Sequence, residues 1–375
     1  MAQKVMMVVR PVSGGMWQHV LTLLDLLDRD YDLVVCCQDD RSQLRELEKR
    51  AVKSLVVHIP ASIRPLADLT ALRRLRRLLR QERPALVHSH GFHGGLLVAA
   101  ARPASIGAAH VCTLHTMVVK EGDGLAKRFA YGVLQRAMLH SVDRVIAVSE
   151  AVRDALPGRE WLERLTVIRN GVDSDRVGPI MTAQQARASI GLGPNANVVG
   201  CVARLSAEKG VLDFVRAAAI LSEKDPGLRF VLVGDGPLRE EVTRLISELG
   251  LETKMRLTGA HFPAGDYMQL FDLTVVPSLS EGQSLAAIES MLLAKPVVAA
   301  NVGGLADVVE SDCGRLVPPG RPDAIARTVA ELMASPLTKR MGQRARESAL
   351  ARFSAKRMGE RTRAVYDMAL QGAGR

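Results

Sequence analysis

Continuous apolar runs alternate with amphipathic segments along the amino-terminal half of the chain. The apolar runs predict strands over Lys4–Val9, Leu33–Cys37, Ser54–Ile59, Ala85–Ser89, His110–Leu114 and Arg144–Ala147. Helical spacing of apolar residues predicts helices over Gln18–Leu27, Ser42–Lys49, Ala67–Glu82, Gly94–Arg102, Leu125–Ser141 and Glu150–Leu156. Strands that are apolar throughout are typical of sheets covered on both faces. The pattern therefore predicts a parallel, doubly wound sheet.

The same pattern begins again after residues 171–183, where Asn-Gly and Gly-Pro pairs interrupt the periodicity. Strands are predicted over Val198–Ala203, Arg229–Val233, Lys254–Thr258, Leu273–Pro277 and Pro296–Ala300. Helices are predicted over Val211–Lys224, Pro237–Leu249, Gly265–Leu270, Ser284–Leu293 and Leu305–Glu310. From Pro322 onward the pattern predicts helices only, the last over Phe353–Leu370.

The chain of 375 residues is long enough for two domains, each with its own core. We expect an α/β protein with one Rossmann-like domain over residues 1–172, a second over 183–352, and a C-terminal helical segment over 353–375. Two such domains that face one another leave a cleft between the carboxyl ends of their strands, and ligands commonly bind there.

Composition narrows the class of protein. Hydrophobic residues make up 47% and charged residues 24%, and no apolar run approaches the length of a membrane span. The 5 cysteines form no CxxC pair and no zinc-ligand spacing, so we expect buried free thiols in a reducing compartment. No signal-peptide pattern precedes the first strand, and we expect a cytoplasmic protein.

The net charge of +10 is unevenly distributed, because residues 73–83, in and beside one predicted helix, hold six arginines against one glutamate, which is half of the excess. Apolar residues at Leu69, Leu72, Leu75 and Leu79 alternate there with basic ones. The arginines are Arg73, Arg74, Arg76, Arg77 and Arg80. One interpretation is a core-facing helix with a solvated basic face. The other is a helix that binds an anionic membrane surface, where each cation contributes about 1 kcal/mol. We expect no nucleic-acid partner, because no recognition module accompanies the arginines and aromatic residues are only 3% of the chain.

Glu281 and Glu289 are the most informative residues of the second domain. The first falls in the loop after a predicted strand and the second about two turns into the following helix, so both carboxylates can face one crevice. Backbone N–H groups of Gln283, Ser284 and Leu285 would lie at the helix N-terminus, where they suit a phosphate or sugar oxygen. This combination favours a ligand with both sugar and phosphate parts.

Two further loops follow predicted strands. Arg204 and Lys209 lie between a strand and a helix, where two cations suit a diphosphate, although they could also be solvated loop charges. Gly14 and Gly15 follow the first strand and would let backbone amides approach a ligand, or could form a plain tight turn.

Several histidines fall at or just after predicted strand ends: His88, His90, His93 and His115. We expect no metal site, because we take His88 and His90 to point to opposite faces of their strand and no cysteine or carboxylate lies nearby. His115 is the best placed to hydrogen-bond a ligand. No GxGxxG follows a strand and no GxxxxGK[ST] occurs, which disfavours a nicotinamide, a flavin or P-loop ATP hydrolysis. No cofactor is expected.

Taken together, these motifs resemble the retaining glycosyltransferases of the GT-B fold, specifically family 4. The motifs run in family order: Gly14-Gly15, His88-x-His90-Gly91, Thr113-x-His115, Val148-Ser149, Asn170-Gly-Val-Asp173, Arg204-x4-Lys209-Gly210, Gly234-Asp-Gly236, Glu281-x7-Glu289 and Gly303-Gly304. The resemblance implies a fold in which the C-terminal helix returns to the first domain. It also implies that the first domain holds the acceptor and the second the nucleotide-sugar.

The resemblance implies a role for each candidate residue. Glu289 would bind the ribose hydroxyls, and Glu281 and His115 the donor sugar. Arg204 and Lys209 would neutralise the diphosphate and its developing charge, so that no metal is needed. The amides of Gln283, Ser284 and Leu285 would hold sugar and phosphate oxygens, and Gly14 and Gly15 would line the other side of the cleft.

The resemblance also implies retention of configuration, which we interpret as same-face displacement because no residue clearly fills the role of a nucleophile. Many relatives carry Phe-Gly where this chain has Gln283-Ser284, so the sugar is open. A UDP-sugar is the first expectation and a GDP-sugar the second. A lipid-linked or surface-polysaccharide precursor at the inner membrane face is the expected acceptor. Two alternatives are a nucleotide-sugar epimerase of similar fold and a non-catalytic nucleotide-sugar-binding protein.

Overall fold

The first sheet consists of the strands β1 (Gln3–Val9), β2 (Tyr31–Cys37), β3 (Lys53–Val56), β4 (Leu86–His90), β5 (Ala109–Leu114), β6 (Arg144–Ala147) and β7 (Leu165–Val167). All pairs are parallel, in the order β3-β2-β1-β4-β5-β6-β7. The computed structural model describes residues 2–11, 14–60, 62–102, 106–119 and 124–373. The chain divides into two units, Met1–Gly171 with Ala355–Arg375 (unit 1) and Val172–Ser354 (unit 2).

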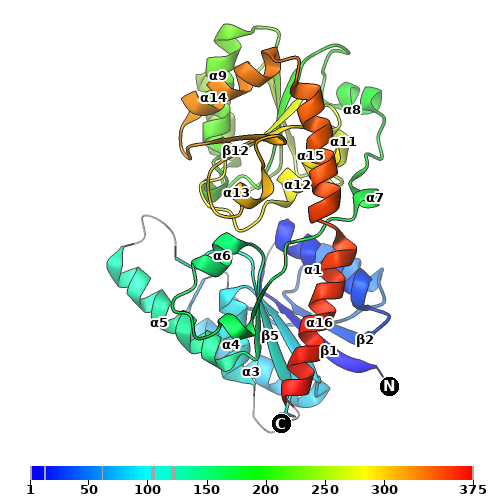
Figure 1. Ribbon diagram of the computed structural model, residues 1–375, viewed down its shortest axis with the longest axis vertical. Coiled ribbons are helices and arrows are strands. Elements are labelled where there is room, and N and C mark those ends of the chain that lie inside the picture. The colour runs from blue at the N-terminus through cyan, green and yellow to red at the C-terminus, as the bar shows by residue number, and fades with distance from the viewer. Residues whose placement is uncertain (1, 12–13, 61, 103–105, 120–123, 374–375) are drawn as a thin grey trace. The chain divides into compact units, whose positions relative to one another are not determined.

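Helices cover both faces of the unit 1 sheet (Figure 1). They are α1 (Gly15–Leu27), α2 (Arg41–Glu48), α3 (Pro65–Glu82), α4 (Phe92–Ala101), α5 (Leu125–Ser141), α6 (Glu150–Asp154) and α16 (Ala355–Ala373), with a 3-10 turn at Leu162–Arg164. Val5 and Met7 of β1 pack with α1 and α16, whereas Met6 and Val8 pack with α3 and α4. Both faces are apolar because side chains alternate along a strand.

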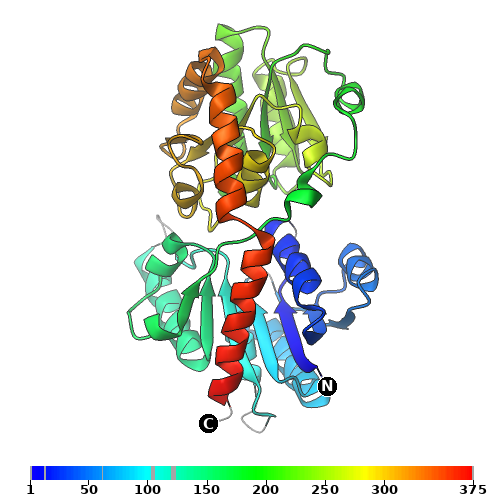
Figure 2. The same cartoon turned by 45° about the vertical axis from the view of Figure 1, so that its right-hand side comes forward.

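The last helix returns to the first sheet, as the family resemblance implied. In Figure 2, α16 runs along the sheet of unit 1 beside α1. Val365, Tyr366 and Ala369 are buried in the same core cluster as β1 and β2. The Tyr366 hydroxyl also lies 2.6 Å from Nδ1 of the buried His88. Residues from opposite ends of the chain therefore share one core.

Unit 2 has a second parallel sheet, in the order β10-β9-β8-β11-β12-β13. Its strands are β8 (Val198–Val202), β9 (Arg229–Val233), β10 (Met255–Gly259), β11 (Leu273–Val276), β12 (Val297–Ala300) and β13 (Gly314–Val317). Its helices are α7 (Ser174–Val177), α8 (Ala183–Ser189), α9 (Val211–Lys224), α10 (Arg239–Glu248), α11 (Gly265–Met268), α12 (Leu285–Leu292), α13 (Leu305–Val308), α14 (Pro322–Ala334) and α15 (Thr338–Arg352), with a 3-10 turn at Ala207–Lys209. Helices α9, α10 and α14 pack on one face, and α8, α11, α12 and α15 on the other. The predicted α/β fold with two Rossmann-like sheets is confirmed.

The pattern of apolar runs missed the edge strands β7 and β13. Both lie at the end of their sheets and are short, and β7 is only partly buried while two residues of β13 are exposed, so neither reads as a continuous apolar run. The last helix also begins at Ala355, because Phe353 is buried in the core of unit 2. On α3, Leu75 and Leu79 are buried as expected, but Leu69 is 42% exposed.

Composition led us to expect buried free thiols and no membrane-spanning helix. Cys36, Cys37, Cys112, Cys201 and Cys313 are all free and buried, as predicted. Burial raises the pKa of Cys36, Cys112 and Cys201 to about 12, so these thiols are inert at neutral pH. Over the described ranges of the chain, no helix has the length and apolar character needed to cross a membrane.

Candidate active site

In unit 2 the order of strands reverses between β8 and β11, which are hydrogen-bonded neighbours. The loops that follow these two strands are held together by their backbones. The carbonyl of Glu208 accepts hydrogen bonds from the N–H groups of Leu279 (2.9 Å) and Ser280 (3.3 Å). Gly210, with a φ of +62°, packs so closely that an added Cβ would lie 2.0 Å from the Pro277 carbonyl oxygen. Such a switch point is where open α/β sheets bind ligands.

This backbone contact brings Lys209 to Glu281. Nζ of Lys209 donates to Oε2 of Glu281 at 2.6 Å, and the hydroxyl of Ser278 donates to the same oxygen at 3.1 Å. Glu281 is only 8% exposed. Its carbonyl accepts from the N–H of Gly304 at 3.2 Å, which brings the loop after β12 to the same place. Loops after three neighbouring strands thus meet around one ion pair.

Arg204 lies in the same loop as Lys209 but differs from it in environment. Its side chain is exposed. Within the described part of the chain its guanidinium forms no ion pair. Arg204 therefore keeps its five N–H donors for a ligand such as a phosphate.

Helix α12 begins beside Glu281. Ser284 is its N-cap residue, and the Ser284 hydroxyl accepts a hydrogen bond from the N–H of Ala287 at 3.3 Å. Gln283 and Ser284 are buried, and Leu285 is the first helical residue. Counting described residues only, the N–H groups of Ser284 and Leu285 have no protein acceptor. These donors are the ones that a helix start offers to an anion.

Glu289 lies on the second turn of α12 with a partly exposed side chain. No residue in the described ranges donates a hydrogen bond to its carboxylate. Burial raises the pKa of Glu289 from 4.5 to about 7. A carboxyl group in this state gains hydrogen bonds when a ligand supplies hydroxyl donors.

In unit 1 the order of strands reverses between β1 and β4. Gly14 is the N-cap residue of α1 and has a φ of +78°, a conformation that favours glycine. Gly14 and Gly15 are both exposed. The predicted site residues Gly14, Gly15 and His115 thus belong to unit 1, and all the others to unit 2.

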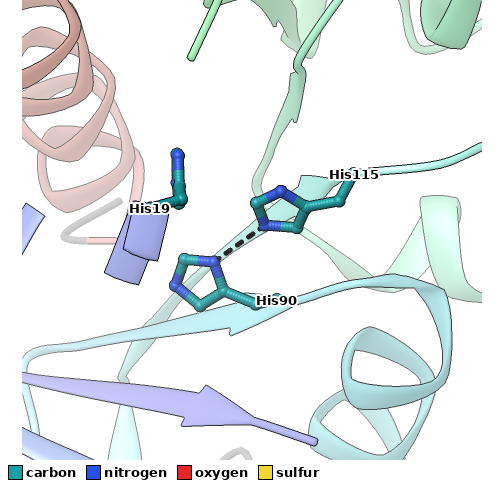
Figure 3. Close-up of side chains that lie close together, drawn as sticks. All are labelled: His19, His90 and His115. Carbon is teal, nitrogen blue, oxygen red and sulfur yellow. Dashed lines mark hydrogen bonds between the residues drawn. The ribbon is translucent and has the colours of Figure 1, made fainter. Parts of the chain in front are cut away.

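His115 lies in a cluster of histidines at the carboxyl edge of the unit 1 sheet (Figure 3). Its Nε2 lies 3.1 Å from Nδ1 of His90, and its ring is 4.7 Å from that of His19. Burial lowers the pKa of His115 and of His90 well below the usual range, and that of His19 to about 4. His19 was not among the predicted site residues. Its signal was a polar residue on the buried face of α1, four positions after Gly15.

Two other histidines have structural partners. The expectation that His88 and His90 point to opposite faces is wrong, because residues two apart on a strand share a face, and the two rings are 4.2 Å apart. The ring nitrogens of His88 pair with the hydroxyls of Tyr366 (2.6 Å) and Thr113 (2.7 Å). His93 pairs with Oδ1 of Asp68 at 2.9 Å. The pairing with Asp68 corrects our assumption that no carboxylate is near these histidines, since α3 packs against α4.

Comparison with known proteins shows which family the chain belongs to. Residues 13–176 match the family described as Glycosyltransferase Family 4, and residues 183–348 match Glycosyl transferases group 1. A D-inositol 3-phosphate glycosyltransferase of Segniliparus rotundus is 31% identical over 304 residues, which cover 77% of this chain and 67% of that protein. The chain therefore belongs to the family 4, group 1 glycosyltransferases, as its motifs indicated.

A further relative and a solved structure are also similar to the chain. The UDP-Gal:alpha-D-GlcNAc-diphosphoundecaprenol alpha-1,3-galactosyltransferase of Escherichia coli is 26% identical over 309 residues, which cover 78% of each chain. The crystal structure of Anabaena Alr3699/HepE in complex with UDP-glucose matches with a TM-score of 0.83 at 22% identity. That match covers 97% of this chain and 99% of the Anabaena chain, and it supports the GT-B architecture.

Proposed function

We propose that this glycosyltransferase moves a sugar from a UDP-sugar to an acceptor hydroxyl, with a GDP-sugar as the second candidate donor. In this proposal residues 183–352 bind the donor, residues 1–172 bind the acceptor, and residues 353–375 return to the acceptor side. The UDP-glucose in Anabaena Alr3699/HepE and the UDP-Gal in the name of the Escherichia coli relative support UDP. Membership of a transferase family favours this function over an epimerase or a non-catalytic binding protein.

The observation that carries the proposal is the group of charges at the β8/β11 edge. Glu289 supplies a carboxyl group to which no described residue donates a hydrogen bond, which suits ribose hydroxyls. The ion pair of Lys209 and Glu281 holds the Glu281 carboxylate at the same edge, where it can accept from hydroxyls of the donor sugar. Within the described residues, only Oε2 of Glu281 has hydrogen-bond partners, so Oε1 remains available.

The diphosphate would be bound by cations and backbone amides without a metal. Arg204 and Lys209 supply two positive charges, and the amides of Gln283, Ser284 and Leu285 supply the start of α12. The negative charge on the departing nucleoside diphosphate grows in the transition state, so these groups lower the barrier. On the acceptor side, Gly14, Gly15 and His115 would line the site, with His115 as a hydrogen-bonding partner of the donor sugar.

We also propose retention of configuration by same-face displacement, in which the leaving phosphate helps to deprotonate the acceptor. The assignment of Glu281 as a hydroxyl ligand supports this route, because Glu281 is already paired with Lys209. NMR analysis of the product anomer tests it, and an inverted product would refute it.

The acceptor is proposed to be a lipid-linked or surface-polysaccharide precursor at the inner face of the membrane, with a cytoplasmic enzyme bound peripherally. The diphosphoundecaprenol in the name of the Escherichia coli relative supports a lipid-linked acceptor. All five arginines of α3, namely Arg73, Arg74, Arg76, Arg77 and Arg80, are exposed. On α5, Leu125 and Phe129 are 86% and 77% exposed beside Lys127 and Arg128. Basic and apolar side chains together suit an anionic bilayer surface.

A thermal-shift titration with UDP-, GDP-, ADP- and CMP-sugars in the presence of a chelator tests the donor site. A ligand at 100 times its dissociation constant adds about 2.7 kcal/mol of stability. We expect UDP-sugars to stabilise the wild type and Glu331→Ala, an exposed glutamate of unit 2, but not Glu289→Ala. No response to any nucleotide-sugar would overturn the proposal. Incubation with the donor alone separates a transferase from an epimerase, because only an epimerase converts the donor without an acceptor.

A further inference from the structure

Three histidines from three different elements converge at the carboxyl edge of the unit 1 sheet. His19 comes from α1, His90 is the last residue of β4, and His115 follows β5 (Figure 3). Each offers a ring nitrogen, and the three nitrogens all lie within 4.8 Å of one another. Nδ1 of His90 and Nε2 of His115 are 3.1 Å apart. Two ligand atoms of one tetrahedral zinc ion lie about 3.3 Å apart, since each zinc–nitrogen bond is about 2.0–2.1 Å long.

All three rings are shielded from water. His19, His90 and His115 are 4%, 0% and 8% exposed. A metal ion bound by Nδ1 of His90 and Nε2 of His115 would replace the 3.1 Å hydrogen bond between these two atoms. A neutral imidazole carries a lone pair on one ring nitrogen, and this lone pair is what a metal ion binds.

We propose that His19, His90 and His115 form a binding site for one divalent transition-metal ion such as Zn²⁺, with three imidazole ligands and one open position. Imidazole favours zinc, copper, nickel and iron, whereas Mg²⁺ and Ca²⁺ favour oxygen ligands. The cluster contains no carboxylate, so Mg²⁺ should not bind. The ring of His19 must turn toward the other two when the ion enters, because His90 and His115 are already at ligand spacing.

The site has a consequence for the reaction, and this consequence rests on the proposed function. If His115 contacts the donor sugar, a metal ion on its ring withdraws it from that contact. The bound ion therefore inhibits transfer, which itself needs no metal. Zinc would therefore compete with the donor sugar for the imidazole of His115.

The test is a titration of the tag-free protein, freed of metal by a chelator, with Co²⁺ and then with Zn²⁺. We expect one equivalent of Co²⁺ to give the intense visible absorption of a tetrahedral ion and Zn²⁺ to displace it. His19→Ala, His90→Ala and His115→Ala should each weaken binding by at least about tenfold. His58→Ala, an exposed histidine of the same unit, is the matched control and should bind like the wild type.

His90→Gln guards against a variant that fails to fold, because it keeps a similar size and removes the imidazole. Co²⁺ binding that is absent from the wild type, or unchanged in the three cluster variants, would overturn the metal site. The UDP-sugar titration is run on the same metal-free samples. Nucleotide-sugar binding without metal binding refutes only the metal site, and metal binding without nucleotide-sugar binding refutes only the proposed function.

Discussion

Lys209 and Glu281 form a 2.6 Å ion pair although they are 72 positions apart in the chain. The pair is only partly accessible, with side chains 28% and 9% exposed. It joins the loop after β8 to the loop after β11, the two neighbouring strands at which the sheet order reverses. The family resemblance assigned Lys209 to the diphosphate and Glu281 to the donor sugar. In the structure these two side chains stabilise one another.

Lys209→Met should lower the free energy of unfolding by about 1–3 kcal/mol, because it leaves the carboxylate of Glu281 buried without its cation. Lys209→Met combined with Glu281→Gln should recover part of the loss. Urea unfolding followed by circular dichroism measures both. Arg239→Ala is the control, since the Arg239–Asp235 pair is 48% exposed on both sides and should contribute less than about 1 kcal/mol. Equal losses in the two single variants would contradict the prediction.

The raised pKa of Glu289 predicts that stability depends on pH. The unfolded chain loses this proton near pH 4.5 and the folded protein only near pH 7, so the folded state binds more protons between these values. Stability from this group is therefore present below about pH 4.5 and is lost as the pH rises through 7. The loss is on the order of 3 kcal/mol. Glu289→Gln should remove it, as seen in urea unfolding at several pH values.

The pH dependence of ligand affinity should also come from Glu289, but with a sign opposite to that of stability. Hydroxyl donors favour the ionised carboxylate, so the affinity for UDP-glucose should fall as the pH drops below about 7, by up to about tenfold per unit. Calorimetric titration across this range measures the slope. The affinity of Glu289→Gln should be lower and should not depend on pH. A variant that retains the slope of the wild type would show that another group titrates.

Gly210→Ala should destabilise unit 2 by about 3 kcal/mol or more. The substitution combines the cost of a φ of +62° with a Cβ placed 2.0 Å from the Pro277 carbonyl oxygen. Gly250→Ala is a matched control, because its φ of +64° is similar but no atom of the described residues lies within 4 Å of the added Cβ. The control should lose only about 1–2 kcal/mol. Thermal unfolding compares the two, and equal losses would mean that the two loops move apart easily.

Replacement of the five α3 arginines by glutamine should weaken binding to vesicles that contain anionic lipid. The five are Arg73, Arg74, Arg76, Arg77 and Arg80. Each cation near such a surface contributes about 1 kcal/mol, so the partition coefficient should fall by at least about a hundredfold. Co-sedimentation with phosphatidylcholine vesicles, with and without phosphatidylglycerol, measures it.

The control for the membrane experiment replaces an equal number of exposed cations on α14 and α15. These are Arg327, Lys339, Arg340, Arg344 and Arg346. Their removal lowers the net charge by the same amount in unit 2. If both sets weaken vesicle binding equally, the attraction is a general charge effect, and the assignment of the surface to α3 falls.

Tyr366→Phe should destabilise the protein by about 1–3 kcal/mol. The change removes the hydroxyl that lies 2.6 Å from Nδ1 of His88 and leaves a buried ring nitrogen without that partner. Met368→Ala, on the same helix but 41% exposed, should change stability by no more than about 0.5 kcal/mol. Urea unfolding measures both variants. If Tyr366→Phe leaves the free energy of unfolding unchanged, α16 is held by its apolar side chains alone.

Local patterns predicted most of the elements well, because a buried parallel strand and an amphipathic helix each carry their signal within a few residues. The bounds of Arg144–Ala147, Arg229–Val233 and Val211–Lys224 agree with the structure at both ends. The edge strand Gly314–Val317 escaped the same reasoning because Arg315 and Leu316 are exposed. The edge strands β3 and β10 were predicted, so the two exposed residues of Gly314–Val317, and not its edge position alone, removed the apolar signal.

The sequence by itself determined the fold class, the family and the residue types at the strand ends, because these depend on local periodicity and on motifs in order. Which of those residues meet was decided by the tertiary structure. The pairing of β8 with β11 brings Lys209 to Glu281, and that of β1 with β4 brings α1 and His19 to the edge where His90 ends its strand. Burial then set their chemistry: desolvation raises the pKa of Glu289 and lowers that of the histidines, and desolvation depends on neighbours that are distant along the chain.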